Sequence, residues 1–408
     1  MMRKFNLDRI NLKKVAFGEK EIVLKRTTYQ KPKIVNDRLV DKNGNPVGTK
    51  GDMYTKMIMD LILQEGCLDH DPRPHYEDEY PGATYDEKKR VITKADGETI
   101  QLYERDSIKY REDGTLVHCT PAHTISINDR FQCTYDLSKG ESPMITLRPI
   151  AMKASTAEIL WIYQKQSNDL VVYDELQGIC TWEDDKPLEE NKINNWWWQW
   201  AIRDKKGKLI LNEKGHPIIG ACYGGTTEPR DMMRREVIDT IKGNVEKNIK
   251  PNPDSRRLIT CLWQIDDFEK PHGLKPCAFL TIWNVRHDWD GEDYLDMTLV
   301  QRSSDFATAG CINQVQYAEL LMLIAKETGL KPGIFTWKPS NVQLYDRHFD
   351  QAIEMLNREP VDDVDATIKI KEGTTFDNAT TKSFAIFTEE DRQKIKTKNP
   401  KLDLPLGI

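Results

Sequence analysis

The sequence predicts an α+β protein in which helices pack on one face of a twisted mixed sheet. Two observations favour this class. Segments with strand-like and helix-like patterns are mixed along the chain, and they do not alternate regularly as βαβ units would. The chain has 408 residues, 38% of them hydrophobic, which is enough to bury one large core or two smaller ones.

The first 50 residues are predicted to be a basic extension, since they hold 13 Lys/Arg against 5 Asp/Glu. Within them, the Asn43-Gly44 pair between short apolar runs predicts a hairpin over 38–47. The same turn chemistry recurs at 204–210 and 212–218, where we expect surface hairpins added to the scaffold. The main domain is therefore expected to span residues 51–408, with insertions at about 76–118 and 183–218.

The next segments predict one helix and one irregular region. A helix is expected at Asp52–Gln64, because apolar residues recur on one side, Asp52 is a suitable cap and Gly66 is a suitable stop. Residues 76–113 are rich in charge. This composition predicts irregular structure there.

Two further helices and a strand pair follow. Residues 151–164 read as a buried helix whose Glu158 is costly to bury unless it is paired or used. Residues 229–247 read as an amphipathic helix that ends near Asn248. The segments Cys277–Arg286 and Tyr294–Gln301 read as strands joined by a turn at 290–291.

The last predicted element of the core is a helix over Gln314–Thr328, which Gly329 closes.

Several classes of protein are disfavoured. A net charge of -6 argues against general nucleic-acid binding, and no apolar run is long enough to cross a bilayer. The first residues lack the apolar stretch of a secretion signal, so we expect a cytoplasmic protein. The eight cysteines show neither C-x-x-C pairs nor zinc-ligand spacing, so no metal site and no disulfide framework is expected.

A series of motifs resembles the thymidylate synthase family, in the same order along the chain. The matching segments are 136–140, 147–150, 158–164, 223–224, 253–257, 276–277, 301–305, Asn313 and 344–345. Their joint occurrence is more specific than any one of them alone. The resemblance covers roughly residues 50–75 and 120–408, interrupted by the insertions. It implies that residues 51–408 form a homodimeric α+β enzyme that moves a one-carbon unit from 5,10-methylenetetrahydrofolate to C5 of dUMP.

The resemblance assigns catalytic roles to five residues. Cys277 is the implied nucleophile, because adding a thiolate to C6 of uracil makes C5 reactive toward an electrophilic carbon. Arg302 is expected to favour the thiolate by lowering the pKa of the thiol. Glu158 and Tyr223 are implied in proton transfer, and Asp305 is implied in holding the pterin and ordering the site. Each also has a plain structural alternative in packing or hydrogen bonding.

Phosphate binding by the family implies four arginines and a serine. They map to Arg73, Arg302, Arg256, Arg257 and Ser303, with the Arg256-Arg257 pair donated by the partner subunit. Guanidinium groups suit a phosphate dianion because they can donate two parallel hydrogen bonds. The alternative for Arg256-Arg257 is a solvated surface pair. If the mapping holds, each site needs two chains.

The base and the sugar are assigned by the same resemblance. Asn313 can accept from uracil N3–H and donate to O4, which favours uracil over cytosine. It could also cap the helix that begins near Gln314. Tyr345 resembles the residue that binds the sugar hydroxyl, and Gln343 stands where the family usually has His.

The folate site is where the chain departs from the family pattern. The implied contacts are Trp197, Trp200, Asp305, Ile312 and Gly407. Trp198 replaces a small polar residue, and core packing is the plain alternative for this tryptophan run. Trp182 offers a competing alignment, and Gly407 is smaller than the family's usual residue.

The product therefore stays open at this point. Hydride transfer to the intermediate gives dTMP, which we expect, whereas water addition gives 5-hydroxymethyl-dUMP. A hydroxymethylase of the kind that some viruses encode is thus an alternative, as is an inactive relative that binds nucleotides or RNA. A thiol hydrolase is disfavoured because no His adjoins Cys277 in the sequence. We expect dUMP and reduced folate as partners, no membrane or nucleic acid, and a bacterial or virus-encoded origin.

Overall fold

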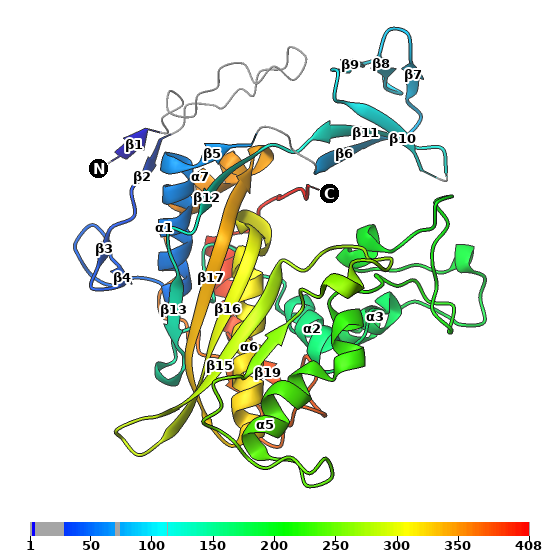
Figure 1. Cartoon of the computed structure of the whole chain (residues 1–408). Helices are drawn as coiled ribbons and strands as arrows, with labels where there is room; N and C mark the ends of the chain where they lie inside the picture. The colour runs from blue at the N-terminus through cyan, green and yellow to red at the C-terminus, as the bar shows by residue number, and fades with distance from the viewer. Residues whose placement is uncertain (1, 5–27, 70–73, 112, 408) are drawn as a thin grey trace.

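A seven-stranded mixed sheet forms the centre of the molecule (Figure 1). The computed structural model describes residues 2–4, 28–69, 74–111 and 113–407. The strand order is β14 (Ile259–Cys261), β15 (Ala278–His287), β16 (Asp293–Asp305), β17 (Lys331–Tyr345), β12 (Thr124–Asn128) and β5 (Cys67–Leu68), and β13 (Cys133–Asp136) also pairs with β17. Only the β16–β17 pair is parallel among these described strands, so the sheet is mixed as expected.

Helices cover one face of this sheet. The longer ones are α1 (Lys50–Glu65), α2 (Met152–Tyr163), α3 (Leu170–Gln177), α6 (Cys311–Thr328), α7 (Phe349–Asn357) and α8 (Glu389–Lys398). Helix α6 packs against β16, β17 and α2, and α1 packs against β12 and α7. The predicted α+β class is therefore confirmed. The predicted helices over 151–164 and 314–328 are also confirmed, the second with Gly329 at φ +74° as its stop.

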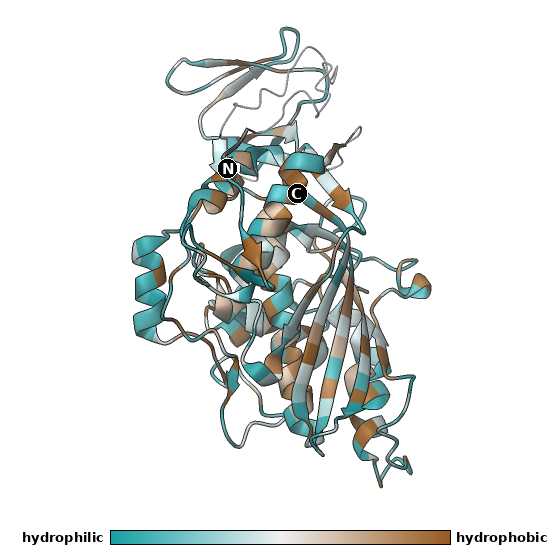
Figure 2. Ribbon diagram, turned by 90° about the vertical axis from the view of Figure 1, so that its left-hand side faces the viewer, coloured by the Kyte–Doolittle hydropathy of each residue, from teal (hydrophilic) through white to brown (hydrophobic). Residues whose placement is uncertain are grey.

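The strand pair β15–β16 places the functional segments next to each other. The alternating Leu295, Met297 and Leu299 are all buried on the helix side. On the other face, Leu280 pairs with Val300 and is only partly buried. In Figure 2 the long strands of the sheet lie in front, and hydrophobic bands alternate with hydrophilic ones along them. The sheet therefore keeps an apolar face that the described chain does not bury.

Helix α1 begins and ends differently from the prediction. Its N-cap is Thr49, and Asp52 is the third residue of the helix, where it completes a capping box. The Thr49 Oγ1 accepts from the Asp52 N–H, and the Thr49 N–H donates to Asp52 Oδ2. Gly66 follows the helix in an extended conformation, so it does not end α1 by a left-handed turn.

The segment predicted as one helix over 229–247 is broken into shorter pieces. Helix α4 (Gly224–Thr227) leads through a π-helical turn at Arg234–Ile238 into α5 (Asp239–Lys242). Gly243, at φ +78°, ends the helix. The predicted end near Asn248 was therefore wrong, because a turn closed by the Asn244–Ile249 bridge follows Gly243.

The insertion after residue 74 is ordered β-structure, and the prediction of irregular structure was wrong. It contains β6 (His75–Tyr80), β7 (Thr84–Asp86), β8 (Val91–Thr93), β9 (Thr99–Gln101), β10 (Ser107–Tyr110) and β11 (Leu116–Pro121) in two antiparallel sheets. Ile92, Leu102 and Leu116 form a small core of its own. Ion pairs between strands, such as Arg111 with Glu77, replace apolar side chains on the outer face.

The predicted surface hairpins are largely confirmed as tight turns. A first hairpin joins β3 (Ile34–Val35) and β4 (Arg38–Leu39), and the Gly44 turn follows it inside a Val40–Pro46 bridge. Turns at 204–208 and 212–216 are closed by backbone bonds of the same kind. Two more short pairs are β1 (Met2–Lys4) with β2 (Thr28–Gln30) and β18 (Lys369–Ile370) with β19 (Phe384–Ala385). Most of the basic extension lies outside the described residues.

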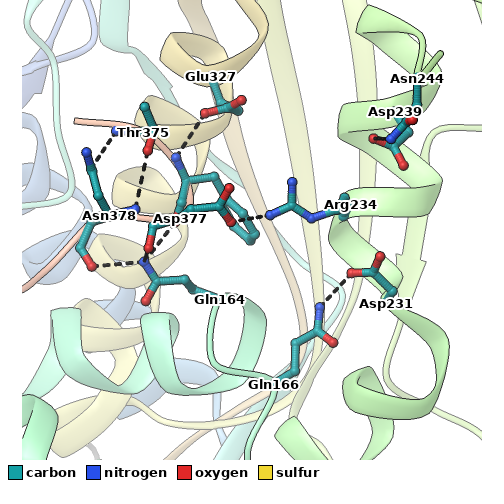
Figure 3. Close-up of polar contacts among 12 residues, drawn as sticks. Gln164, Gln166, Asp231, Arg234, Asp239, Asn244, Glu327, Thr375, Asp377 and Asn378 are labelled. Atoms are coloured by element: carbon teal, nitrogen blue, oxygen red, sulfur yellow. Dashed lines mark hydrogen bonds and ion pairs between the residues drawn. The ribbon is translucent and has the colours of Figure 1, made fainter. Parts of the chain in front are cut away.

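A polar network fastens the C-terminal part of the chain to the end of α2 (Figure 3). The Gln164 Nε2 donates to the carbonyl oxygens of Phe376 at 2.7 Å and Ala379 at 2.9 Å. The Glu327 carboxylate accepts from the Phe376 N–H at 2.9 Å, and Arg234 pairs with Asp377. These bonds hold residues 375–379 against the helix that carries Glu158.

Candidate active site

Cys277 immediately precedes β15, and two neighbouring elements bond its backbone. Its N–H donates to the Tyr223 hydroxyl at 3.0 Å, and its carbonyl accepts from the Arg302 N–H at 2.9 Å. Burial raises the pKa of the Cys277 thiol, while the Arg302 charge and the Tyr223 hydroxyl lower it. The predicted effect of Arg302 thus has the right direction. Burial is the larger effect, so the net shift of this pKa is upward.

The Arg302 guanidinium spans the segment that precedes the cysteine. Its Nε donates to the Pro276 carbonyl at 2.8 Å and its Nη2 donates to the Lys275 carbonyl at 2.6 Å. The group also lies over the Trp263 ring, 5.6 Å from its centroid. A guanidinium has five N–H donors, so these two bonds leave others for an anion. Ser303 follows on β16 and is partly buried.

Tyr223 adopts an unusual backbone conformation just before α4. Its φ of +47° is uncommon for a non-glycine residue, and such conformations cluster at functional sites. The next residue must be small, because a Cβ at Gly224 would come within 1.8 Å of the Ser167 carbonyl oxygen. The Tyr223 ring is buried and meets the Trp197 ring edge-on, with 5.0 Å between centroids. This packing fixes the hydroxyl beneath Cys277.

Glu158 is buried in α2, and aromatic side chains supply its hydrogen bonds. Its Oε2 accepts from the Trp197 indole N–H at 2.9 Å and from the Trp196 indole N–H at 3.1 Å. Tyr173 contributes a longer contact of 3.5 Å. Burial raises the pKa of Glu158 to about 7, and these donors offset part of the rise. A carboxyl with this pKa can both give and take a proton near neutral pH.

The tryptophan run forms a 3₁₀ turn over Trp196–Trp200 whose side chains point in different directions. Trp197 is buried, and Trp200 packs edge-on against it at 5.3 Å. Trp198 turns outward under Arg203. The structure thus brings Trp197 to Glu158 and Tyr223. The competing Trp182 packs instead on His216, away from these groups.

Asn313 is the third residue of α6, so the alternative that it caps this helix was wrong. Its Oδ1 accepts from the Gln301 Nε2 at 3.0 Å, and its Nδ2 donates to the Gln316 Oε1 at 3.1 Å. The Gln301 Oε1 in turn accepts from the Trp337 indole N–H at 2.8 Å. Asn313 therefore belongs to a chain of amides that runs from the sheet into α6.

Asp305 ends β16 next to this chain. Thr308 donates to its Oδ2, whereas its Oδ1 is buried without a hydrogen-bond partner. The nearest cation candidate for that oxygen is the His348 Nδ1, 3.7 Å away. Ile312 lies partly exposed in the first turn of α6. The free carboxylate oxygen is suited to accept N–H donors from a ligand.

Tyr345 ends β17 and lies under the C-terminal segment. Its ring meets Tyr76 of the insertion edge-on at 6.1 Å. A Cβ at Gly407 would come within 2.7 Å of the Tyr345 ring, which explains why the smallest residue stands there. The His348 Nε2 bonds the Pro405 carbonyl at 2.6 Å and holds the same segment. Gln343 lies two residues earlier on β17, opposite Asp305 in register.

Those of the predicted phosphate arginines that lie in the described part of the chain belong to separate segments. Arg256 and Arg257 are both exposed in the segment that precedes β14, and the structure gives their side chains no bond to Cys277 or Arg302. Arg73 lies outside the described residues. Arg302 is thus the only one of the four that the described part of a single chain places beside the cysteine.

No cluster of three or more metal-ligating side chains occurs among the described residues. All eight cysteines lie in the described part of the chain and are free thiols. Within that part, no helix is long and apolar enough to cross a membrane.

Several residues around the site were missed in the sequence. Trp196 and Tyr173 bond Glu158, Gln316 bonds Asn313, and His348 lies next to Asp305. The helical spacing of Asn313 and Gln316, three residues apart, was a signal that could have indicated their contact. Trp196 and Tyr173 gave no such signal, because their contacts depend on how distant segments pack.

Comparison with known proteins identifies relatives over most of the chain. The thymidylate synthase family model matches residues 107–399. A thymidylate synthase of Lactococcus lactis is 35% identical over 67% of this chain and 84% of that protein. One from Streptococcus pneumoniae is 33% identical over 88% of this chain and 100% of that protein. The solved structure of thermostable thymidylate synthase A from Bacillus subtilis matches with a TM-score of 0.57 and 22% identity, over 88% of this chain and 98% of that one, which supports the fold.

Proposed function

Because the chain belongs to the thymidylate synthase family, we propose that it converts dUMP to dTMP with 5,10-methylenetetrahydrofolate as cosubstrate and Cys277 as nucleophile. The observation that carries the proposal is the buried group around Cys277. Tyr223 bonds the cysteine backbone, Trp197 packs on Tyr223, and Glu158 accepts from Trp197. Tyr223 and Trp197 thus connect the nucleophile Cys277 with the Glu158 carboxyl, which is proposed to transfer protons.

Cys277 would act first on the uracil ring. Its Sγ, as a thiolate, forms a bond to C6, and the ring electrons move toward C5 and O4. Arg302 stabilises the thiolate of Cys277. A substrate anion bound at the same guanidinium holds the nucleotide beside this cysteine. Glu158, whose pKa is raised to about 7, donates a proton toward O4 as charge develops there. After C5 has gained the one-carbon unit and lost its proton, the C6–S bond breaks and returns the thiolate.

The folate supplies the one-carbon unit and the hydride when it is bound. Two features of the chain support a site for it. The buried Asp305 Oδ1 lacks a partner and can accept from pterin N–H groups. Trp196, with 41% of its surface exposed beside Glu158, offers a ring face for stacking. Trp200, which packs on Trp197, and Ile312 would add apolar surface around the folate, and exclusion of water there would favour hydride transfer over water addition.

We further propose that the active unit is a homodimer. On the open sheet face, Leu280, Ile282 and Val300 are partly buried and Ile259 is 39% exposed. Burying such an apolar sheet face against a second copy of the chain is favourable. Arg256 and Arg257 are exposed at the edge of this face, so they are free to reach phosphate in the partner's site beside Arg302 and Ser303.

The test measures dihydrofolate formation from dUMP and methylenetetrahydrofolate, together with the mass of the nucleotide product. We expect dihydrofolate and dTMP in equal amounts, and complete loss of both in Cys277→Ser. A matched Cys261→Ser variant, also partly buried, should keep full activity. Turnover without dihydrofolate, or an active Cys277→Ser variant, would rule out the proposal.

A further inference from the structure

The β-insertion that begins after residue 74 packs directly on Tyr345, at the end of β17. Figure 1 shows this insertion above the central sheet. Its first strand, β6, contributes Tyr76, whose ring meets the Tyr345 ring edge-on. The two tyrosines form a small apolar cluster with Ala122, in which each residue is at most 5% exposed. The insertion therefore supplies part of the surface that holds the Tyr345 ring in place.

An arginine holds the Tyr76 ring from its face. The Arg347 guanidinium lies over this ring, 3.9 Å from its centroid. It donates two parallel bonds to the Asp78 carboxylate, at 2.9 Å and 2.8 Å, and another to the Thr120 hydroxyl at 3.1 Å. Bidentate pairing of this kind fixes the plane of the guanidinium. Arg347 thereby ties β6 and β11 to the end of β17.

A second set of bonds fixes the other end of the Tyr76 side chain. The Tyr76 hydroxyl donates to Asp346 Oδ1 at 2.6 Å, and the same oxygen accepts from the Arg347 N–H at 2.9 Å. The Asp346 N–H in turn donates to the His123 carbonyl at 2.8 Å. The two residues after Tyr345 thus bind the insertion, and the insertion packs back on the Tyr345 ring.

Tyr345 itself faces the active site. It lies on the same side of β17 as Gln343, two residues earlier, which pairs in register with Asp305 of β16. Burial raises the pKa of the Tyr345 hydroxyl, and the charges of Asp305 and Cys277 raise it further. Both charges act on this hydroxyl because it lies near them. The hydroxyl is therefore placed to meet a nucleotide bound at Cys277.

We propose that the insertion takes part in substrate binding, and that Tyr76 and Arg347 are positioning residues which set the Tyr345 hydroxyl against the sugar of dUMP. The deoxyribose of dUMP carries one free hydroxyl, at C3′, so this is the group that Tyr345 would bind. The inference rests on the proposed function, since it concerns the same substrate in the same site. Tyr76 and Arg347 do not touch the substrate in this account, because both act through Tyr345.

The first experiment measures kcat/KM for dUMP and for its 3′-deoxy analogue, which lacks the sugar hydroxyl. The ratio of two values from one protein sample does not depend on the fraction that is folded, so it reports how the hydroxyl is bound rather than stability. We expect Arg347→Met to lower the preference for dUMP about 10-fold, because a displaced Tyr345 weakens one hydrogen bond. Tyr345→Phe, which has no hydroxyl, gives the largest loss for comparison.

Arg111→Met is the matched control. Arg111 also pairs with carboxylates of β6, but these are Glu77 and Glu79, which lie on the opposite face of the strand from Tyr76. Removing this exposed pair weakens the same strand without changing the contact between Arg347 and Tyr76. The dUMP preference should therefore stay within about twofold of wild type. An equal fall in both arginine variants would overturn the specific role of Arg347.

A second variant decides the matter if Arg347→Met does not fold. Arg347→Lys keeps a positive charge near Asp78, but lysine cannot form two parallel bonds or lie flat on the Tyr76 ring. We expect the dUMP preference of this variant to fall about threefold or more. A preference equal to that of wild type in either folded variant would overturn the inference.

The outcomes also separate the inference from the function on which it rests. Wild-type protein that forms no dihydrofolate from dUMP would contradict the proposed function itself. Active wild-type protein that uses dUMP and the 3′-deoxy analogue equally well would overturn the inference alone, because Tyr345 would then bind no sugar hydroxyl.

Discussion

At the scale of single residues, the buried environment of Glu158 predicts how activity depends on pH. Its pKa is raised to about 7 by burial, so the acid that donates toward O4 ionises as the pH rises through 7. The Cys277 thiolate becomes more abundant over the same range, because the pKa of this thiol is also raised. We therefore expect kcat/KM for dUMP to rise up to about pH 7 and then to level off, and this break near 7 is the limb of the profile that Glu158 sets. Glu158→Gln should lower kcat by about 10²–10⁴-fold and abolish this limb of the profile. Glu390→Gln, on the exposed face of α8, is the control and should leave the profile unchanged.

A second buried carboxyl, Glu319, predicts how stability depends on pH. Burial raises its pKa to about 8, and Thr156 donates its only described hydrogen bond. Since the folded state then binds the proton more tightly than the unfolded chain, stability must fall as the pH rises from about 5 to about 8. Glu319→Gln should flatten this fall and add about 2–5 kcal/mol to the free energy of unfolding at pH 9.

Urea unfolding of both proteins at pH 5 and pH 9 checks this prediction. At pH 5 the two should differ in stability by less than about 1 kcal/mol, because pH 5 lies only slightly above the ordinary pKa of a glutamate in the unfolded chain. A variant that is less stable than wild type at pH 9 would contradict the assignment of Glu319 as a destabilising buried acid.

Single residues of the site could be predicted from motifs, but their surroundings could not. The structure brings Cys277, Tyr223 and Glu158 into one buried group, as the sequence motifs indicated. The net pKa of Cys277 was not predictable, because it depends on burial as well as on Arg302.

Among the helices and strands, the end of α2 offers the clearest test of how distant segments are held. The Gln164 NH₂ donates its two shortest bonds to the part-buried carbonyls of Phe376 and Ala379, and removing it takes away both bonds. Gln164→Ala should therefore lower the free energy of unfolding by about 1–3 kcal/mol. Gln393→Ala, on the exposed face of α8, should change it by less than about 0.5 kcal/mol. Equal stability of the two variants would contradict this account of the network.

Element prediction succeeded where apolar residues follow a clear period. Strands β15 and β16 alternate Leu295, Met297 and Leu299 with polar residues, and α6 has both an apolar face and a glycine stop. The insertion was missed because its strands are held by cross-strand ion pairs and a small core rather than by a long apolar pattern. The break in the 229–247 segment was missed because a π-helical turn keeps helical periodicity while changing the hydrogen bonds.

For the molecule as a whole, the exposed Arg256 and Arg257 predict that two chains build each site. We expect Cys277→Ser protein and an Arg256→Ala/Arg257→Ala protein to be almost inactive when each is assayed alone. After random exchange of subunits, half of the dimers contain one of each chain, and each such dimer holds one intact site. About a quarter of wild-type activity should therefore return.

The control is the same mixture of the two proteins, kept under conditions in which subunits do not exchange. Recovery only after exchange supports arginines that reach across the dimer. If both arginines served their own chain, the mixed dimer would contain no intact site and no activity would return.

The bond from Cys277 to the uracil ring is the claim on which the account depends. It is tested most directly with 5-fluoro-dUMP, because fluorine at C5 cannot leave as the proton does, so the reaction stops with the sulfur attached. The protein is incubated with this nucleotide and methylenetetrahydrofolate, and its intact mass and peptides are then measured. We predict a mass increase equal to nucleotide plus folate, on the peptide that contains Cys277. A protein that turns over dUMP but shows no adduct, or carries it on another residue, would contradict the account.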